Sequence, residues 1–97
     1  MATYITLLNY TQQGIKNVKE SPARDDAAKK AIQSMGGEIK QMYLTMGQYD
    51  SVVIFEAPDD ETVAKLLLAT GAQGNVSTQT MRAFTEDEFR KIVAGLP

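Results

Sequence analysis

Two strand-like segments in the middle of the chain are separated by only a tight turn. Residues 38–46 (EIKQMYLTM) and residues 49–57 (YDSVVIFEA) are rich in the apolar, aromatic and β-branched residues that favour strands. Gly47 lies between them, and so short a connection joins only the antiparallel strands of a hairpin. The sequence therefore predicts an antiparallel hairpin in the middle of the chain.

Strand and helix patterns alternate on either side of this hairpin. Strands are predicted at residues 3–10 and 76–84 from their β-branched and aromatic residues. Helices are predicted at residues 21–35 and 58–71 from apolar residues spaced three and four apart. The order β-α-β-β-α-β is the split β-α-β, or ferredoxin-like, arrangement, an α+β fold with both helices on one face of a four-stranded antiparallel sheet. One domain over residues 1–97 is expected.

Local signals mark the ends of the helices. Ser21 is the predicted N-cap of the first helix, and Gly36 suits the left-handed conformation that ends it. The acidic run Asp59-Asp60-Glu61 stands at the start of the second helix, where the helix dipole favours negative charge. Thr85 and Glu88 form a T-x-x-E capping box that predicts a third, C-terminal helix.

The length of the hairpin loop decides which residues share a face of the sheet. A three-residue loop, Gly47 to Tyr49, places Met42 on the face of Val52, whereas a two- or four-residue loop places it beside Val53. A shift of one residue reverses every side chain of a strand. With the three-residue loop, the side chains of the four strands divide into two distinct faces.

One face is then almost entirely hydrocarbon and is expected to pack on the two main helices. Its side chains are Ile5, Leu7, Met42, Leu44, Val52, Ile54, Met81 and Ala83. The opposite face, called the mixed face, combines apolar side chains with hydroxyls and amides. It carries Tyr4, Thr6, Leu8, Tyr10, Ile39, Gln41, Tyr43, Thr45, Ser51, Val53, Phe55, Val76, Thr78, Thr80 and Arg82.

The mixed face is predicted to be an interface between two copies of the chain. It is too apolar for water, because each large apolar side chain left exposed forfeits roughly 1.5–3 kcal/mol. It is also too rich in hydroxyls for a dry core, which favours two sheets paired around a partly polar cavity. In the alternative, the C-terminal helix folds over this face, but its short apolar stripe would cover only part of it. A homodimer, or a higher homo-oligomer built through the sheet face, is therefore expected.

Five residues are candidates for binding a small-molecule ligand in this cavity: Tyr4, Thr6, Tyr43, Asp50 and Arg82. The tyrosine hydroxyls could orient a ligand, although structural packing with a satisfied hydroxyl is favoured. Arg82 needs acceptors, which an acidic side chain of the other copy, an anionic ligand or solvent would supply. Asp50 ends the sequence Gly47-Gln48-Tyr49-Asp50, for which a turn is favoured over a ligand site at the rim.

The residues that are absent exclude several kinds of chemistry. Without cysteine or histidine, the chain lacks the usual zinc and haem ligands and the Ser–His or Cys–His nucleophiles. No cofactor or metal is expected, and the run Asp59-Asp60-Glu61 is interpreted as helix capping. A net charge of −2 argues against nucleic acid as a partner. No apolar run approaches about 20 residues and the N-terminus lacks the charged start of a signal peptide, so no membrane association and a cytoplasmic location are expected.

Three segments together resemble the GYD domain family of small bacterial and archaeal proteins. They are LLNYTQQGIKNVKESPAR, MGQYDSVVIFEAPDD and GNVSTQTMRAFTEDEF, in the usual order and spacing from Tyr4 to Phe89. One departure is Gln48, where an acidic residue is common. The resemblance implies a ferredoxin-like α+β barrel that dimerises through its sheet. It implies no reaction, because the family has no established activity, and it transfers no catalytic residue.

Two functions remain open from the sequence. The first is a homo-oligomeric binding or structural module with a semi-polar cavity at the sheet interface, favoured because no catalytic set converges. The alternative is a cofactor-independent enzyme, monooxygenase- or isomerase-like, acting on a small organic substrate. The wider structural relatives of the family favour this alternative only by analogy of fold.

Overall fold

The computed structural model describes residues 1–97 and contains four strands and four α-helices. The strands are β1 (Ala2–Tyr10), β2 (Glu38–Leu44), β3 (Ser51–Ala57) and β4 (Val76–Ala83). The helices are α1 (Gln12–Lys16), α2 (Ser21–Ser34), α3 (Asp60–Ala72) and α4 (Glu86–Ala94), with a 3₁₀ turn, η1 (Val18–Glu20), before α2.

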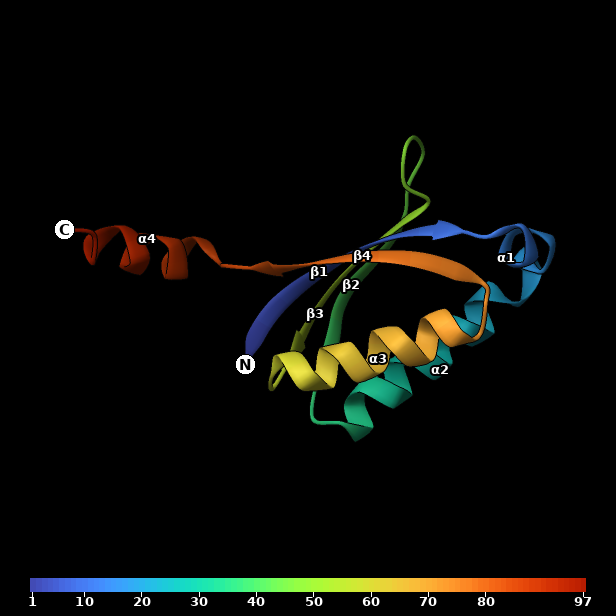
Figure 1. Cartoon of the computed structure of the whole chain (residues 1–97), viewed down its shortest axis with the longest axis horizontal. Helices are drawn as coiled ribbons and strands as arrows, with labels where there is room; N and C mark the ends of the chain where they lie inside the picture. The colour runs from blue at the N-terminus through green and yellow to red at the C-terminus, as the bar shows by residue number, and fades with distance from the viewer.

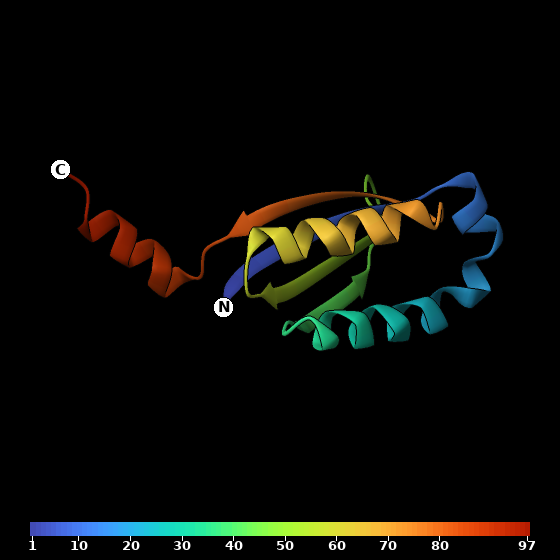
Figure 2. The same ribbon diagram turned by 60° about the horizontal axis from the view of Figure 1, so that its bottom comes forward.

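The four strands form one antiparallel sheet in the order β2-β3-β1-β4. Helices α2 and α3 lie on the same side of this sheet, α2 against β2 and α3 against β4 and β3 (Figure 1, Figure 2). This arrangement confirms the predicted α+β, ferredoxin-like order of elements with an antiparallel four-stranded sheet.

The helices cover the opposite face of the sheet from the one predicted. Tyr4 and Phe55 form one buried core with Ile32 of α2 and Val63 of α3. Because neighbours along a strand point to opposite sides, the face away from the helices carries the hydrocarbon side chains. These residues, called the open face from here on, are Ile5, Leu7, Val52, Ile54, Met81 and Ala83. The prediction that they pack on the helices is wrong.

The polar side chains of the mixed face that are buried under the helices have partners there. Tyr4 stacks on Phe55 with ring centroids 5.4 Å apart, and its hydroxyl donates to Asp60 of α3. The hydroxyls of Thr6 and Thr80 bond each other across β1 and β4 at 2.7 Å. A hydroxyl that has a partner is buried at little cost. The many hydroxyls of the mixed face were therefore not a sign that the helices leave this face uncovered.

The β2–β3 hairpin has the register that was predicted for a two- or four-residue loop, not the one for a three-residue loop. Met42 lies opposite Val53, so the three-residue loop is wrong, and residues 45–50 connect the two strands. A β-bulge between Ile39 and Gln41 also shifts the pairing within β2. The side chains of β2 therefore change faces partway along the strand, which a strict alternation does not predict.

Most of the predicted helix signals are confirmed. The Asp59 side chain accepts a backbone N–H at the start of α3, and Thr85 with Glu88 forms both bonds of the capping box of α4. Gly36 follows α2 with φ +86°. Ser21 differs from the prediction, because it is the first residue of α2, which begins without a side-chain cap.

Helix α4 extends away from the rest of the molecule and covers neither face of the sheet (Figure 1, Figure 2). Its apolar stripe remains open, with Phe89 60%, Val93 47% and Leu96 65% exposed. The alternative in which the C-terminal helix folds over the mixed face is therefore wrong. The extended helix also gives the molecule its elongated dimensions of 51 × 31 × 18 Å.

Candidate functional site

A groove runs between α2 and α3, with the helix side of the sheet as its floor. Its volume is about 650 Å³, the larger of the two cavities in the chain. This helix groove is mainly apolar; its central lining is Leu8, Val53 and Phe55 from the sheet, Ile32 from α2, and Leu66 and Leu67 from α3.

Small side chains on α2 leave this space open. Ala27, Ala28 and Ala31 line the helix groove, and each carries only a methyl group. Helix α2 packs on the edge strand β2 while α3 packs on β4 and β3, so the two helices stand over different parts of the sheet. Methyl groups cannot span the gap between them, which leaves Leu66 and Leu67 only half-buried.

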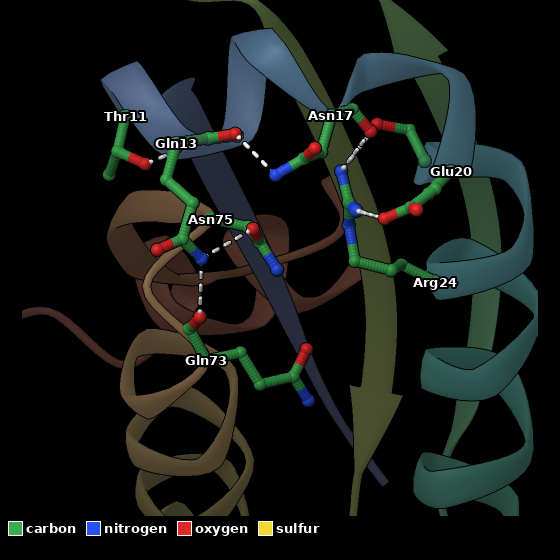
Figure 3. Close-up of polar contacts among 9 residues, drawn as sticks. Thr11, Gln13, Asn17, Glu20, Arg24, Gln73 and Asn75 are labelled. Atoms are coloured by element: carbon green, nitrogen blue, oxygen red, sulfur yellow. Dashed lines mark hydrogen bonds and ion pairs between the residues drawn. The ribbon is translucent and has the colours of Figure 1, made fainter.

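A cluster of hydrogen bonds joins the β1–α1 turn to the α3–β4 turn at one end of the molecule (Figure 3). The Thr11 N–H donates to the Asn75 carbonyl at 3.0 Å, and the Thr11 hydroxyl donates to the Gly74 carbonyl at 2.6 Å. The Gln13 amide donates to the Gln73 carbonyl and to the Asn75 side chain, each at 3.0 Å. These bonds, called the turn clasp, fix the end of α3 beside α1.

Gly14 allows the two turns of the clasp to meet. It is buried, and a Cβ at this position would lie 1.8 Å from the carbonyl oxygen of Asn75. Its own N–H donates to the Thr11 hydroxyl at 3.1 Å, which caps α1. No side chain larger than hydrogen fits here without moving one turn away from the other.

Arg24 lies near the start of α2 and lines the helix groove. Figure 3 shows it beside Asn17 and Glu20. Its guanidinium donates to the Asn17 carbonyl at 3.3 Å and to the Ser21 hydroxyl at 3.0 Å, and Glu20 lies 3.5 Å away. Burial raises the pKa of the neighbouring Asp25 carboxyl. Arg24 is therefore occupied by partners within its own chain.

The Gly47-Gln48-Tyr49-Asp50 segment lies in the 45–50 connection between β2 and β3, which bends at Gly47 and Gln48. Gly47 has φ +119°, a conformation in which a side chain would be strained. Asp50 Oδ2 accepts the N–H of Tyr10 at 2.9 Å, and the Asp50 N–H donates to the Leu8 carbonyl at 2.8 Å. Asp50 thus anchors the hairpin to β1, and it also lines the helix groove.

A smaller cavity of about 330 Å³ lies near the start of α3 and is lined by Tyr4, Asp60 and Arg82, among others. The hydrogen bond to Asp60 raises the pKa of the Tyr4 hydroxyl above its usual value of 10.0, and burial of the hydroxyl raises it further. The Arg82 guanidinium lies 4.4 Å from the ring centroid of Phe84, donates to two backbone carbonyls and is 3.8 Å from Glu88. Arg82 therefore finds its acceptors within the chain.

The five predicted ligand-binding residues do not gather in one site. Thr6 and Asp50 line the helix groove, whereas Tyr4 and Arg82 line the smaller cavity. Tyr43 touches one margin of the groove, but it lies opposite Val52 and its side chain is 52% exposed on the open side of the sheet. Four of the five thus lie on the helix side of the sheet rather than on the uncovered side.

Sequence reasoning did not select Tyr10, Thr78 and Leu67, which line the helix groove. Strand alternation had already placed Tyr10 and Thr78 on one face with Thr6. The alanines of α2 were a second available signal, because a stripe of methyl groups cannot fill the space above a sheet. These residues were not selected because the sequence did not show that their face of the sheet lies under the helices.

The open face has an apolar centre and a charged margin. Its central side chains are half-buried or exposed, and Met81 is 43% exposed. At the margin, Lys40 lies 3.1 Å from Glu38 and 3.3 Å from Glu56, and these two carboxylates raise the pKa of Lys40. Protein interfaces are commonly built in this way, with an apolar core and a polar rim.

The chain offers few groups for other kinds of site. No three acidic side chains are placed together so that they could hold a metal ion. None of its helices combines the length and the apolar composition needed to cross a membrane. The features that remain are two cavities under the helices and one uncovered apolar side of the sheet.

The chain is similar in sequence to one curated protein and in fold to several solved structures. A curated protein of Thermus thermophilus, named "Glutamine synthetase and cystathionine beta-lyase binding protein", is 31% identical over 84 residues, which are 86% of this chain and 88% of that protein. Among solved structures, FFRP-DM1 is similar with a TM-score of 0.58 at 21% identity, over 87% of this chain and 100% of that one. A hypothetical protein from Pyrococcus horikoshii has a TM-score of 0.53 at 19% identity, over 89% of this chain and 93% of that one.

The two solved structures show the fold alone, because their sequences are too distant to carry function. The family comparison is more specific, since the model described as GYD domain matches residues 4–93, nearly the whole chain. The chain therefore belongs to the GYD domain family.

Proposed function

We propose that the protein is a homodimeric binding module, in which two copies pair through their open faces and the pair binds another protein. The observation that carries the proposal is the open face, which no helix of the chain covers (Figure 2). Apolar side chains as large as Ile5, Leu7 and Ile54 each forfeit up to roughly 1.5–3 kcal/mol when they are left uncovered. Large apolar patches with a polar rim mark interaction surfaces.

A protein partner for the pair is supported by the Thermus thermophilus relative, whose name describes binding to two enzymes. The chain also presents apolar side chains beyond the sheet. In the hairpin, Leu44 is 79% and Met46 98% exposed, and the stripe of α4 is open as well. These projections would remain available to a partner protein after two open faces have paired.

A second candidate is the cofactor-independent enzyme, which the ligand-sized helix groove favours. The binding function is preferred because of the state of the cavity hydroxyls. The Tyr4 hydroxyl donates to Asp60, and this hydrogen bond raises its pKa, whereas an activated nucleophile or base needs the opposite shift. The smaller cavity therefore holds a tyrosine suited to hydrogen bonding rather than to nucleophilic attack.

The pairing is tested by Ile5→Lys, which places a charge at the centre of the open face. Gln33→Lys is the control, because it adds the same charge at an exposed position of α2. We expect Ile5→Lys to weaken self-association at least about tenfold and Gln33→Lys to leave it unchanged, as measured by sedimentation velocity over a concentration series. Equal association constants for the two variants would contradict the proposal.

The class of partner is tested by measuring binding to glutamine synthetase and to cystathionine beta-lyase from the organism that encodes this chain. Saturable binding to either enzyme supports a protein partner of this class, and binding to neither counts against it.

A further inference from the structure

We propose that the helix groove binds an uncharged, mostly apolar small molecule that carries a hydroxyl or amide group at one end. The groove lies on the helix side of the sheet, opposite the open face, so this inference does not rest on the pairing proposed above. Its volume of about 650 Å³ is within the range of about 300–1,000 Å³ found for small-molecule sites.

The middle of the groove supplies apolar contacts on three sides. Val53 forms part of the floor, Ile32 stands on the α2 side, and Leu66 and Leu67 stand on the α3 side. Val53 and the two leucines pack only partly against the core and remain half-buried. Because the chain leaves these surfaces uncovered, an apolar ligand gains free energy by covering them.

Three polar residues gather at the end of the groove beside the turn clasp. Tyr10 comes from β1, Thr78 from β4, and Asp50 stands just before β3. The strand pairing brings them together, because Leu8 pairs with Thr78 on one side and accepts the Asp50 N–H on the other. Asp50 accepts the Tyr10 N–H with Oδ2, which leaves Oδ1 to accept a hydrogen bond from a ligand. This end therefore suits a hydroxyl or an amide.

The charges around the groove argue for an uncharged ligand. Asp25, Asp26 and Asp50 line it together with Arg24 and Lys29, so acidic groups outnumber basic ones. Arg24 already donates to a backbone carbonyl and to a serine hydroxyl, and it offers no free fork for a phosphate or a carboxylate. A cation would have to lose its water against the leucine walls, which is costly.

The ligand class is tested by titrating 2-naphthol into the isotope-labelled full-length chain and following the backbone amides by NMR. Naphthalene-2-carboxylate is the anionic comparison. We expect saturable shifts at Leu8, Val53 and Leu67, and an affinity for the carboxylate at least about tenfold lower. Shifts that are absent, or scattered outside the groove, would overturn the site. Equal affinity for the two compounds would overturn the ligand class.

A pair of tryptophan substitutions on α2 tests the location independently. Ala28→Trp fills the groove, whereas Ala23→Trp adds the same side chain at an exposed position of α2 that does not line it. We expect only Ala28→Trp to lower the 2-naphthol affinity, by about tenfold or more. The chain has no tryptophan of its own, so the emission of Ala28→Trp should also be blue-shifted relative to Ala23→Trp. Equal affinities and equal emission would overturn the location.

Tyr10→Phe tests the polar end without altering the volume of the groove. It removes one hydroxyl, so it should weaken 2-naphthol and leave naphthalene, which has no hydroxyl, unaffected. This comparison remains decisive even where Ala28→Trp fails to fold. An unchanged affinity for 2-naphthol would overturn the assignment of the polar end. All of these readouts are independent of the molar mass of the protein, so their failure is distinguishable from failure of the dimer.

Discussion

A single methyl group at residue 14 would collide with the neighbouring turn, since it would lie 1.8 Å from the Asn75 carbonyl oxygen. We expect Gly14→Ala to lower the free energy of unfolding by about 1–3 kcal/mol, because one side of the turn clasp must move. Gly71 is the matched control, since it lies within α3 with open space around it. Gly71→Ala should raise the free energy of unfolding by about 0.5–1 kcal/mol, because alanine favours helix. Urea denaturation measures both, and equal changes would contradict the close approach.

Tyr4 gives the stability of the chain a specific dependence on alkaline pH. Its hydrogen bond to Asp60 raises its pKa, so the folded chain holds a proton that the unfolded chain loses above about pH 10. The contribution of Tyr4 to stability is therefore complete below that pH and falls as the pH rises further. Tyr4→Phe should flatten this alkaline fall, as measured by urea denaturation between about pH 9 and 11. An equal fall in both proteins would contradict the assignment.

At the residue scale, the sequence predicted what depends on near neighbours. The Thr85–Glu88 capping box involves residues three positions apart and is confirmed, and Gly47 has the positive φ that its position between two strands suggested. The partner of Tyr4 was not predictable in the same way, because Asp60 is 56 positions away. A side-chain contact over that distance depends on the packing of α3 on the sheet, and strand periodicity carries no information about it.

Helix caps have different consequences at α3, which packs on the sheet, and at α4, which extends away from it (Figure 1). Asp59 accepts the Thr62 N–H at the start of α3, and Thr85 accepts the Glu88 N–H at the start of α4. We expect Asp59→Ala to lower the midpoint of global unfolding, because α3 is part of the core. Thr85→Ala should instead speed amide exchange within α4 alone, since short helices without packing are marginal.

The comparison of these two cap variants by hydrogen exchange and thermal denaturation also reports on α4 itself. Equal losses of global stability would contradict the independence of α4. Such a result would show that its apolar stripe is covered in the folded protein.

At the element scale, the order and type of the main elements followed from periodicity and turn residues, whereas their faces did not. The β-bulge between Ile39 and Gln41 and the longer 45–50 connection both change which side chains share a face. Neither feature gives the sequence of β2 a residue pattern that differs from that of a regular strand. The alanine stripe of α2 was visible, but its consequence, an open groove, appears only when α3 is placed beside it.

At the scale of the whole molecule, the sequence indicated that one side of the sheet would need a cover but selected the wrong side. Tyr4, Thr6 and Phe55 of the mixed face are buried under the helices, and the Thr6 hydroxyl has its partner in Thr80. The side left open is the more apolar one, with Ile5, Leu7 and Ile54 at its centre. The open face is therefore a more apolar candidate interface than the mixed face that the sequence favoured.

The molar mass of the unmodified chain in solution shows whether a second copy covers the open face. Light scattering on the protein eluting from a sizing column, over a range of loading concentrations, measures this mass. Pairing through the open face predicts a particle of twice the chain mass of 10.6 kDa. A particle with the mass of one chain at every concentration would contradict it.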